Sequence, residues 1–267
     1  MAFESLGIDS VIIVAVLAGA VAFFYSNLGL GGGQLYVPIM DLFFISLVMK
    51  DIVPLSLCFA FVTMLSATYT HSRKGLVHFK LGSFLAAGGL VGVVGGVIFT
   101  TTVSEWVVKV AFAALLVVVA TKMIYDLRRE RKDYVGCPTS WSLRCRLAGV
   151  GVSILTGFLI GCFGVGGGVV SVPLIIYVFR FEPRYAIGTS ALVGAILTPA
   201  AFLVYVLREG AAINYDLALV LTPVVFLMGV IGSTWGLKKL RTKSVKMIFM
   251  GGVYLAASEM ILSLLFE

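Results

Sequence analysis

The chain has 267 residues, of which 60% are hydrophobic and only 12% are charged, and its mean hydropathy is +1.08. A water-soluble domain is about 45–50% apolar and about 25% charged, so a soluble core is excluded and the bilayer is the expected solvent. The net charge of +7 is therefore expected to mark one side of a membrane and not a nucleic-acid footprint.

Ten apolar helical segments are predicted, which makes the expected fold class an all-α polytopic membrane protein. Eight of them approach the length of about 20 residues that crosses a bilayer, and two shorter ones each follow a run of glycines. In chain order the segments are 9–28, 33–49, 53–72, 79–101, 104–126, 147–163, 168–180, 185–207, 215–237 and 244–266. The first segment is expected to be retained, because the residues before it are acidic, unlike a signal peptide.

Two copies of one glycine-rich phrase interrupt these segments. Residues 29–38 read GLGGGQLYVP and residues 164–173 read GVGGGVVSVP, an offset of 135 residues (164 − 29). Consecutive glycines break a helix, and a broken helix at membrane depth is tolerated only beside protein or a water-filled cavity. Two such breaks at equivalent places in two halves point to the substrate site of a transporter, near the midplane of the bilayer.

The basic residues predict how the chain crosses the membrane. The loop 127–146 carries six Arg and Lys residues, and placing it inside leaves only Lys50, Lys109 and Arg208 of the 20 basic residues outside. Both termini are then extracytoplasmic. Five segments per half is an odd number, so the second half enters the membrane upside down relative to the first. The predicted organisation is a first inverted repeat 1–126, a basic cytoplasmic linker 127–146 and a second inverted repeat 147–267.

The helices that restart at Gly33 and Gly168 are expected to present N–H groups with no intrahelical acceptor and the positive end of the helix dipole. Two such N-termini that meet favour an anion without the cost of a buried cationic side chain. Neutral polar side chains near the breaks add donors. The predicted substrate-binding residues are Asn27, Gly31, Gly32, Gly33, Gln34, Ser56, Gly166, Gly167, Gly168, Ser171, Thr189 and Ser190.

Simpler roles stay open for several of these residues. Glycines also allow close helix packing, and Ser and Thr hydroxyls bond back to their own helix. Packing is the expected role of a second set of glycines, namely Gly88, Gly89, Gly92, Gly95 and Gly96.

The charged residues inside or beside the apolar segments have alternative roles. Asp41 is either a proton-coupling carboxylate or, as we favour, an interfacial residue of the outer vestibule; the matching position in the second half is Ile176. Lys109 and Lys246 are expected to snorkel to the interface or to attract anions. The four cysteines do not have the spacing of a metal or disulfide site, and neither a metal nor another cofactor is expected.

The doubled G-x-G-G-G-x-x-x-x-P phrase, the chain length and the basic central loop resemble the TauE/SafE sulfite exporter family over essentially the whole chain. The resemblance implies movement of sulfite, organosulfonates or related sulfur anions across the bacterial inner membrane. It carries the family motif onto Gly29, Gly31, Gly32, Gly33 and Pro38 and onto Gly164, Gly166, Gly167, Gly168 and Pro173.

Together these observations predict a secondary transporter, not an enzyme, that moves a small sulfur-containing oxyanion by alternating access. The expected partners are this anion and membrane lipid, with no nucleic acid; a homodimer and a coupling proton stay open. The alternatives are an anion channel, a non-transporting membrane scaffold subunit and an intramembrane enzyme. The enzyme is disfavoured because the sequence has no G-x-S-G phrase, no H-E-x-x-H phrase and no pair of intramembrane acids.

Overall fold

The computed structural model describes residues 8–44, 47–128, 143–209 and 215–239, together with Tyr254 and Ser258. Within these ranges the chain is helical and contains no strand. The helices are α2 Ile8–Tyr25, α3 Gly33–Phe43, α4 Met49–Ser72, α5 Phe79–Thr102, α6 Glu105–Arg128, α7 Leu143–Phe163, α8 Gly168–Phe179, α9 Pro183–Glu209 and α10 Tyr215–Lys239. Most of the expected linker 127–146 and nearly all of the expected tenth segment 244–266 lie outside the described residues.

The apolar helices are those of a multi-pass membrane protein. Four of them, α4, α5, α9 and α10, contain stretches long and apolar enough to cross a membrane, and α2 and α7 are shorter apolar helices. Large apolar side chains face outward on several helices, among them Val91, Leu207 and Leu219, which are 68%, 77% and 79% exposed. The expected all-helical membrane fold is therefore confirmed, while the division into ten segments and two inverted repeats stays a prediction.

Both predicted helix breaks are present at the glycine runs. Helix α2 ends at Tyr25 and α3 begins at Gly33, while α7 ends at Phe163 and α8 begins at Gly168. Between them three glycines of each run adopt positive φ, with values of 58°, 75° and 85° in the first run and 64°, 71° and 78° in the second. Such angles cost a residue with a Cβ about 1–2 kcal/mol, which explains why glycine occupies these positions.

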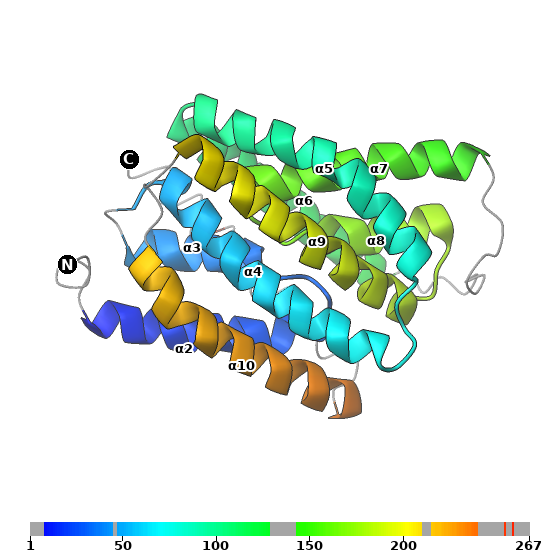
Figure 1. The fold of residues 1–267 in the computed structure, drawn as a ribbon, viewed down its shortest axis with the longest axis horizontal. Coiled ribbons are helices and arrows are strands. Elements are labelled where there is room, and N and C mark those ends of the chain that lie inside the picture. The colour runs from blue at the N-terminus through cyan, green and yellow to red at the C-terminus, as the bar shows by residue number, and fades with distance from the viewer. Residues whose placement is uncertain are drawn as a thin grey trace.

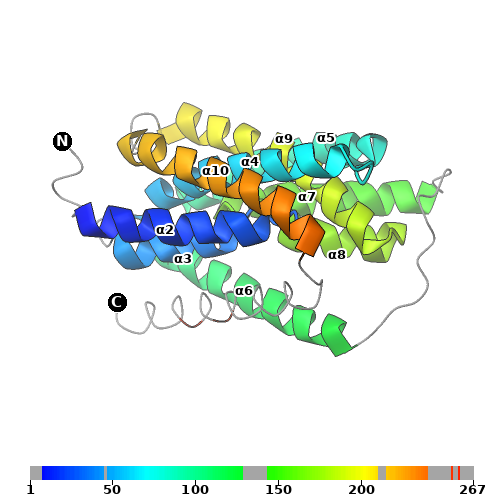
Figure 2. The same cartoon turned by 90° about the horizontal axis from the view of Figure 1, so that it is seen from below.

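Each glycine run turns the chain back into a helical hairpin. Asp41, close to the end of α3, pairs with Lys109 near the start of α6, whereas Gly33 at its start faces the second glycine run. Helix α3 therefore returns to the end of the bundle at which α2 began, and Figures 1 and 2 show the two helices side by side there. Helices α7 and α8 form the corresponding hairpin at the other end, where a Cβ added to Gly149 would lie 2.9 Å from the Phe179 ring.

The two ends of the bundle are distinguished by the residues that meet there. At the first end, which we call end A, Met49, Thr100 and Glu105 line one pocket. At the opposite end, end B, the backbone N–H of His78 donates to the Thr189 hydroxyl and the His78 ring packs against Phe181. Helices α4 and α6 thus begin at end A, and α5 and α9 begin at end B.

Glycines bring the helices of the bundle into close contact. Helix α5 packs on α7 and α9, and α10 packs on α2 and α4; Figure 1 shows α5 with α7 and α2 with α10 at opposite edges and α4 with α9 between them. The predicted packing role of the α5 glycines is confirmed, because a Cβ added to any of them would contact α7. These glycines are Gly88, Gly89, Gly92, Gly95 and Gly96.

A pair of glycine substitutions tests this helix contact. Alanine is the better helix former by about 1 kcal/mol, so propensity alone predicts stabilisation. A Cβ at Gly92 would collide with the backbone carbonyl of Ile154, so we expect Gly92→Ala to lower the melting temperature, at an overpacking cost of about 1–3 kcal/mol. A Cβ at Gly151 meets no atom within 4 Å, so Gly151→Ala should keep or raise it. Equal melting temperatures of the two purified variants would contradict the contact.

Candidate functional site

The two glycine runs meet at the centre of the bundle, backbone against backbone. A Cβ added to Gly31 would lie 2.8 Å from the Cα of Gly166, and one added to Gly166 would lie 2.9 Å from the Cα of Gly31. A Cβ on Gly33 would likewise lie 2.8 Å from the Cα of Val165. No side chain fits between the runs, so glycine is required here by this contact as well as by the positive φ angles.

Serines from the flanking helices bond the glycine runs crosswise. Ser56 on α4 donates to the carbonyl oxygen of Gly164 at 3.4 Å, and Ser190 on α9 donates to the carbonyl oxygen of Gly29 at 3.2 Å. Each break is thereby held by a hydroxyl from the opposite half of the chain. The Ser56 hydroxyl has one proton and lies closer to the Val53 carbonyl of its own helix, at 2.8 Å, so the back-bond is the stronger contact and the crosswise contact to Gly164 is the weaker one.

Ser171 extends this group of hydroxyls. Its oxygen lies 2.7 Å from the Ser190 hydroxyl and 2.8 Å from the Gly167 carbonyl oxygen. Each serine has one hydroxyl proton. The contacts among Ser171, Ser190 and the carbonyls of Gly167 and Gly29 therefore outnumber the two protons, and one contact always lacks a donor. Because the three contacts can never all be satisfied, the Ser171 or Ser190 hydroxyl can turn toward an acceptor on a ligand without breaking a fully satisfied hydrogen-bond network.

Gln34 is the polar side chain that most directly indicates a ligand. It lies in the first turn of α3, is 0% exposed and sits beside the Tyr25 hydroxyl. The Tyr25 hydroxyl is its polar neighbour, and neither Oε1 nor Nε2 makes a hydrogen bond of good geometry within the described part of the chain. Burying an unpaired amide costs about 1–3 kcal/mol, so such a group in a packed interior needs an explanation.

The backbone around Gln34 adds further donors. The N–H groups of Leu35 and Tyr36 bond to the Gly32 carbonyl, so the earlier N–H groups of Gly33 and Gln34 have no intrahelical acceptor. Asn27, just before the break, donates from Nδ2 to the Phe23 carbonyl at 3.0 Å, while its Oδ1 has no partner in the described structure. The first half of the chain therefore gathers amide groups with unused hydrogen-bonding capacity beside the glycine contact.

The structure separates Thr189 from the other predicted residues. Its hydroxyl accepts the backbone N–H of His78 at 3.1 Å and so ties α9 to the connection between α4 and α5 at end B. Neither of the two positions in the second half that match Asn27 and Gln34 carries an amide side chain. Cys162 stands at the position that matches Asn27, and its sulfur lies 3.4 Å from the Gly96 carbonyl oxygen.

Of a row of buried hydroxyls on α4, only Ser56 was predicted. The Tyr36 hydroxyl lies 3.0 Å from the Thr63 hydroxyl, and Thr70 lies 2.9 Å from Ser233 on α10. Ser56, Thr63 and Thr70 recur every seven residues, two turns of a helix, so they share one face of α4. That spacing is visible in the sequence and is the signal by which the row can be found.

The expected snorkelling of Lys109 is wrong. Its side chain is 7% exposed, and its Nζ lies 3.7 Å from Asp41 and 3.6 Å from Glu105. Two carboxylates compensate the ammonium group, so it does not need to reach bulk water. Asp41 is 9% exposed and is therefore part of a buried charge cluster at end A.

A second pair of glycine substitutions distinguishes the effect of the backbone contact from the effect of the positive φ angle. Gly31 and Gly75 both have positive φ, 75° and 68°, but a Cβ at Gly75 meets nothing within 4 Å. We expect Gly75→Ala to cost about 1–2 kcal/mol from its backbone angle alone. Gly31→Ala should cost a further 1–3 kcal/mol or so, because it forces the two runs apart. Thermal unfolding in detergent measures both, and a Gly31→Ala melting temperature equal to that of Gly75→Ala would contradict the backbone contact.

Comparison with known proteins finds a matching family and relatives over most of the chain. The family model of the sulfite exporter TauE/SafE matches residues 11–260. The probable membrane transporter protein YunE of Bacillus subtilis is 25% identical over 255 residues, which are 89% of this chain and 91% of the relative. Probable membrane transporter proteins of Methanocaldococcus jannaschii and Haemophilus influenzae are 25% and 28% identical, over 82% and 70% of this chain and 80% and 70% of theirs. No solved structure matches the chain.

Proposed function

Because this chain belongs to the TauE/SafE sulfite exporter family and is a membrane transporter of that type, we propose that it carries a small sulfur-containing oxyanion, sulfite or an organosulfonate, as a secondary transporter. The observation that carries this proposal is the meeting of two broken helices at the centre of the bundle, beside the buried and unpaired amide of Gln34. Backbone N–H groups at helix N-termini favour an anion.

The donors around the glycine contact suit an anion that must also leave. The N–H groups of Gly33 and Gln34, the Gln34 side-chain amide and the hydroxyls of Ser171 and Ser190 are all neutral. A buried cation would hold the anion more tightly and would itself be costly at membrane depth. The oxygens of a sulfite or sulfonate group accept several such hydrogen bonds at once.

Transport requires the two glycine runs to move apart. The contact between Gly31 and Gly166 leaves no space for a ligand, and it favours a carrier that opens to each side in turn over a continuously open anion channel. The hairpins α2–α3 and α7–α8 enter from opposite ends of the bundle and are the natural moving parts. Separation of each hairpin from the helices around it exposes the centre to one side of the membrane at a time.

The charge distribution supports the topology that we propose, with end B in the cytoplasm of a bacterium and end A outside. The basic residues at end B include Arg73, Lys74, Lys80, Arg180 and Arg184. The helices that begin at end A carry acids in their first turns, Asp9, Asp51, Glu105 and Asp216. Cytoplasmic loops of membrane proteins are enriched in Lys and Arg.

The packing supports an inverted repeat around the glycine contact. Helices α2, α3, α4 and α5 match α7, α8, α9 and α10 in order, and the two hairpins enter from opposite ends. We therefore propose that residues 1–126 and 147–267 are inverted repeats joined by the linker 127–146. In such transporters the substrate lies between the repeats near the midplane.

Gln34→Leu tests the site without damage to the fold. The substitution removes an unpaired buried amide, so we expect an unchanged or higher melting temperature. The anion loses a hydrogen bond, so uptake of ³⁵S-sulfite into proteoliposomes should fall by roughly tenfold or more. The matched control is Thr198→Val, whose buried hydroxyl donates to Gly194 within α9 and which should keep wild-type uptake. Wild-type uptake by a folded Gln34→Leu protein would refute this placement of the site.

A further inference from the structure

Thr156 on α7 is a buried threonine whose hydroxyl has no partner. The residue is 1% exposed, and its Oγ1 makes no hydrogen bond within the described part of the chain. A threonine inside a helix can donate to the carbonyl four residues earlier, so a buried hydroxyl without this bond needs an explanation. Four other buried threonines of the bundle make this bond, namely Thr63, Thr70, Thr100 and Thr198.

Thr156 lies beside the start of α8. Helix α8 begins at Gly168, and Gly167 precedes it as the N-cap residue. A Cβ added to Gly167 would lie 3.5 Å from the methyl carbon of Thr156. The hydroxyl of Thr156 is bonded to the same carbon atom as this methyl group, so it lies at the N-terminus of α8 as well.

The N-terminus of α8 offers further hydrogen-bond donors. The Ser171 N–H bonds to the Gly167 carbonyl at 2.9 Å, so the N–H groups of Gly168 and Val169 lie ahead of this bond and have no acceptor inside the helix. The Ser171 hydroxyl lies 2.8 Å from the same carbonyl oxygen. Hydroxyls and N–H groups at the positive end of a helix dipole favour an anion.

We propose that Thr156 is a further ligand of the transported oxyanion and binds it from the second half of the chain, an inference that rests on the proposed transport function. The ligand class is a small anion with several acceptor oxygens, such as sulfite or a sulfonate group. The site then has two faces, with the Gln34 amide on the first and the hydroxyls of Thr156 and Ser171 on the second.

Gln34 and Thr156 approach the glycine contact from opposite ends of the bundle. Gln34 lies in the first turn of α3, which runs from the contact to end A. Thr156 lies beside the first turn of α8, which runs to end B, and two turns before α7 ends at Phe163. When the glycine runs separate, an anion between Gly31 and Gly166 has Gln34 on one side and Thr156 on the other.

Packing alone does not explain a threonine at this position. The offset of 135 residues between the glycine runs matches Thr156 with Val21 (156 − 135). Val21 has the same place in the first hairpin, because a Cβ added to Gly32 would lie 2.8 Å from its Cγ1. Valine and threonine have similar shapes, so a valine fits this position and the hydroxyl of Thr156 is the feature that needs a role.

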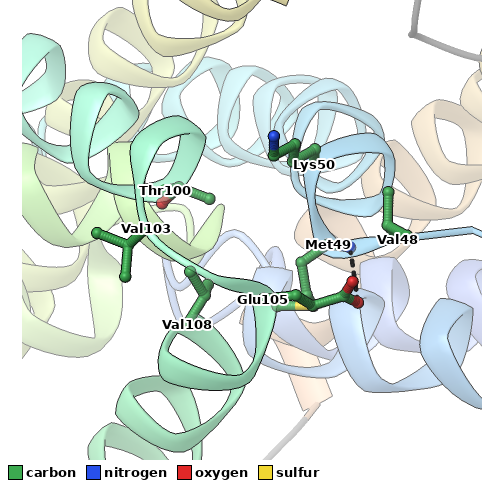
Figure 3. A pocket seen from close by; sticks show the side chains of 7 residues that line it. All are labelled: Val48, Met49, Lys50, Thr100, Val103, Glu105 and Val108. Atoms are coloured by element: carbon green, nitrogen blue, oxygen red, sulfur yellow. Dashed lines mark hydrogen bonds between the residues drawn. The ribbon is translucent and has the colours of Figure 1, made fainter.

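The pocket at end A is the alternative place for an anion. It has a volume of about 220 Å³, and Lys50 and Glu105 are among the residues that line it (Figure 3). The Glu105 carboxylate accepts the backbone N–H of Met49 at 3.3 Å, and its negative charge repels an anion. Lys50 would attract one, so Lys50→Gln reveals any binding in this pocket.

Thr156→Val tests the ligand role. It removes an unpaired buried hydroxyl, so we expect an unchanged or higher melting temperature without ligand. In isothermal titration of the purified protein with sulfite or methanesulfonate, it should bind roughly tenfold more weakly than the wild type, and Thr156→Val combined with Gln34→Leu roughly a hundredfold more weakly. Thr156→Ser keeps the hydroxyl and should bind like the wild type.

The matched controls are Thr198→Val, whose hydroxyl donates to Gly194 within its own helix, and Lys50→Gln; both should bind like the wild type. Wild-type affinity of a folded Thr156→Val protein would overturn the inference and leave the proposed function intact. Weaker binding by Lys50→Gln alone would place the anion in the pocket and overturn it too.

Titration with sulfate separates this inference from the proposed substrate. If the wild type binds sulfate and neither sulfite nor methanesulfonate, and Thr156→Val weakens that binding, the Thr156 site is supported and the proposed substrate is refuted. Binding of sulfite that depends on Thr156, without any flux of ³⁵S-sulfite in proteoliposomes, would support the site and refute transport. A wild type that binds none of the three anions would overturn both.

Discussion

Direct contact between two glycine backbones at the centre of the bundle is the constraint on which the rest of the structure depends. Gly31 and Gly166 touch because neither has a side chain, and positive φ angles in both runs turn α3 and α8 back toward opposite ends. Broken helices inside a membrane leave carbonyl and N–H groups that lipid cannot satisfy. Ser56 and Ser190 satisfy part of this demand from the opposite half of the chain, so each break is stabilised by the other half.

The two hairpins have similar backbone geometry but carry different side chains. The first carries Gln34 at the centre and Asp41 at end A, whereas the matching positions in the sequence of the second hairpin are Val169 and Ile176. In the transport cycle that we propose, α8 supplies the opposing backbone surface and α3 supplies the polar groups that respond to the anion. Because of this asymmetry, the two halves of the transporter have similar folds but contribute different chemical groups.

The sequence predicts the breaks well because consecutive glycines have a local and direct effect on the backbone. The predicted helix 33–49 is too long, since α3 ends at Phe43 and α4 already begins at Met49; both stretches are apolar, so hydropathy does not mark the turn between them. Thr189 and Lys109 show a second limit. The direction of a hydroxyl and the partners of an ammonium group depend on how helices are rotated and packed against one another, which spacing within one segment does not determine.

The central claim is that the anion binds where the two glycine runs touch. An experimental structure of the purified protein with sulfite tests this claim most directly. We expect density for the anion between Gly31 and Gly166, with the two backbones separated and the Gln34 amide turned toward the ligand. Sulfite bound elsewhere, for example in the pocket beside Glu105, with the glycine backbones still in contact, would contradict the claim.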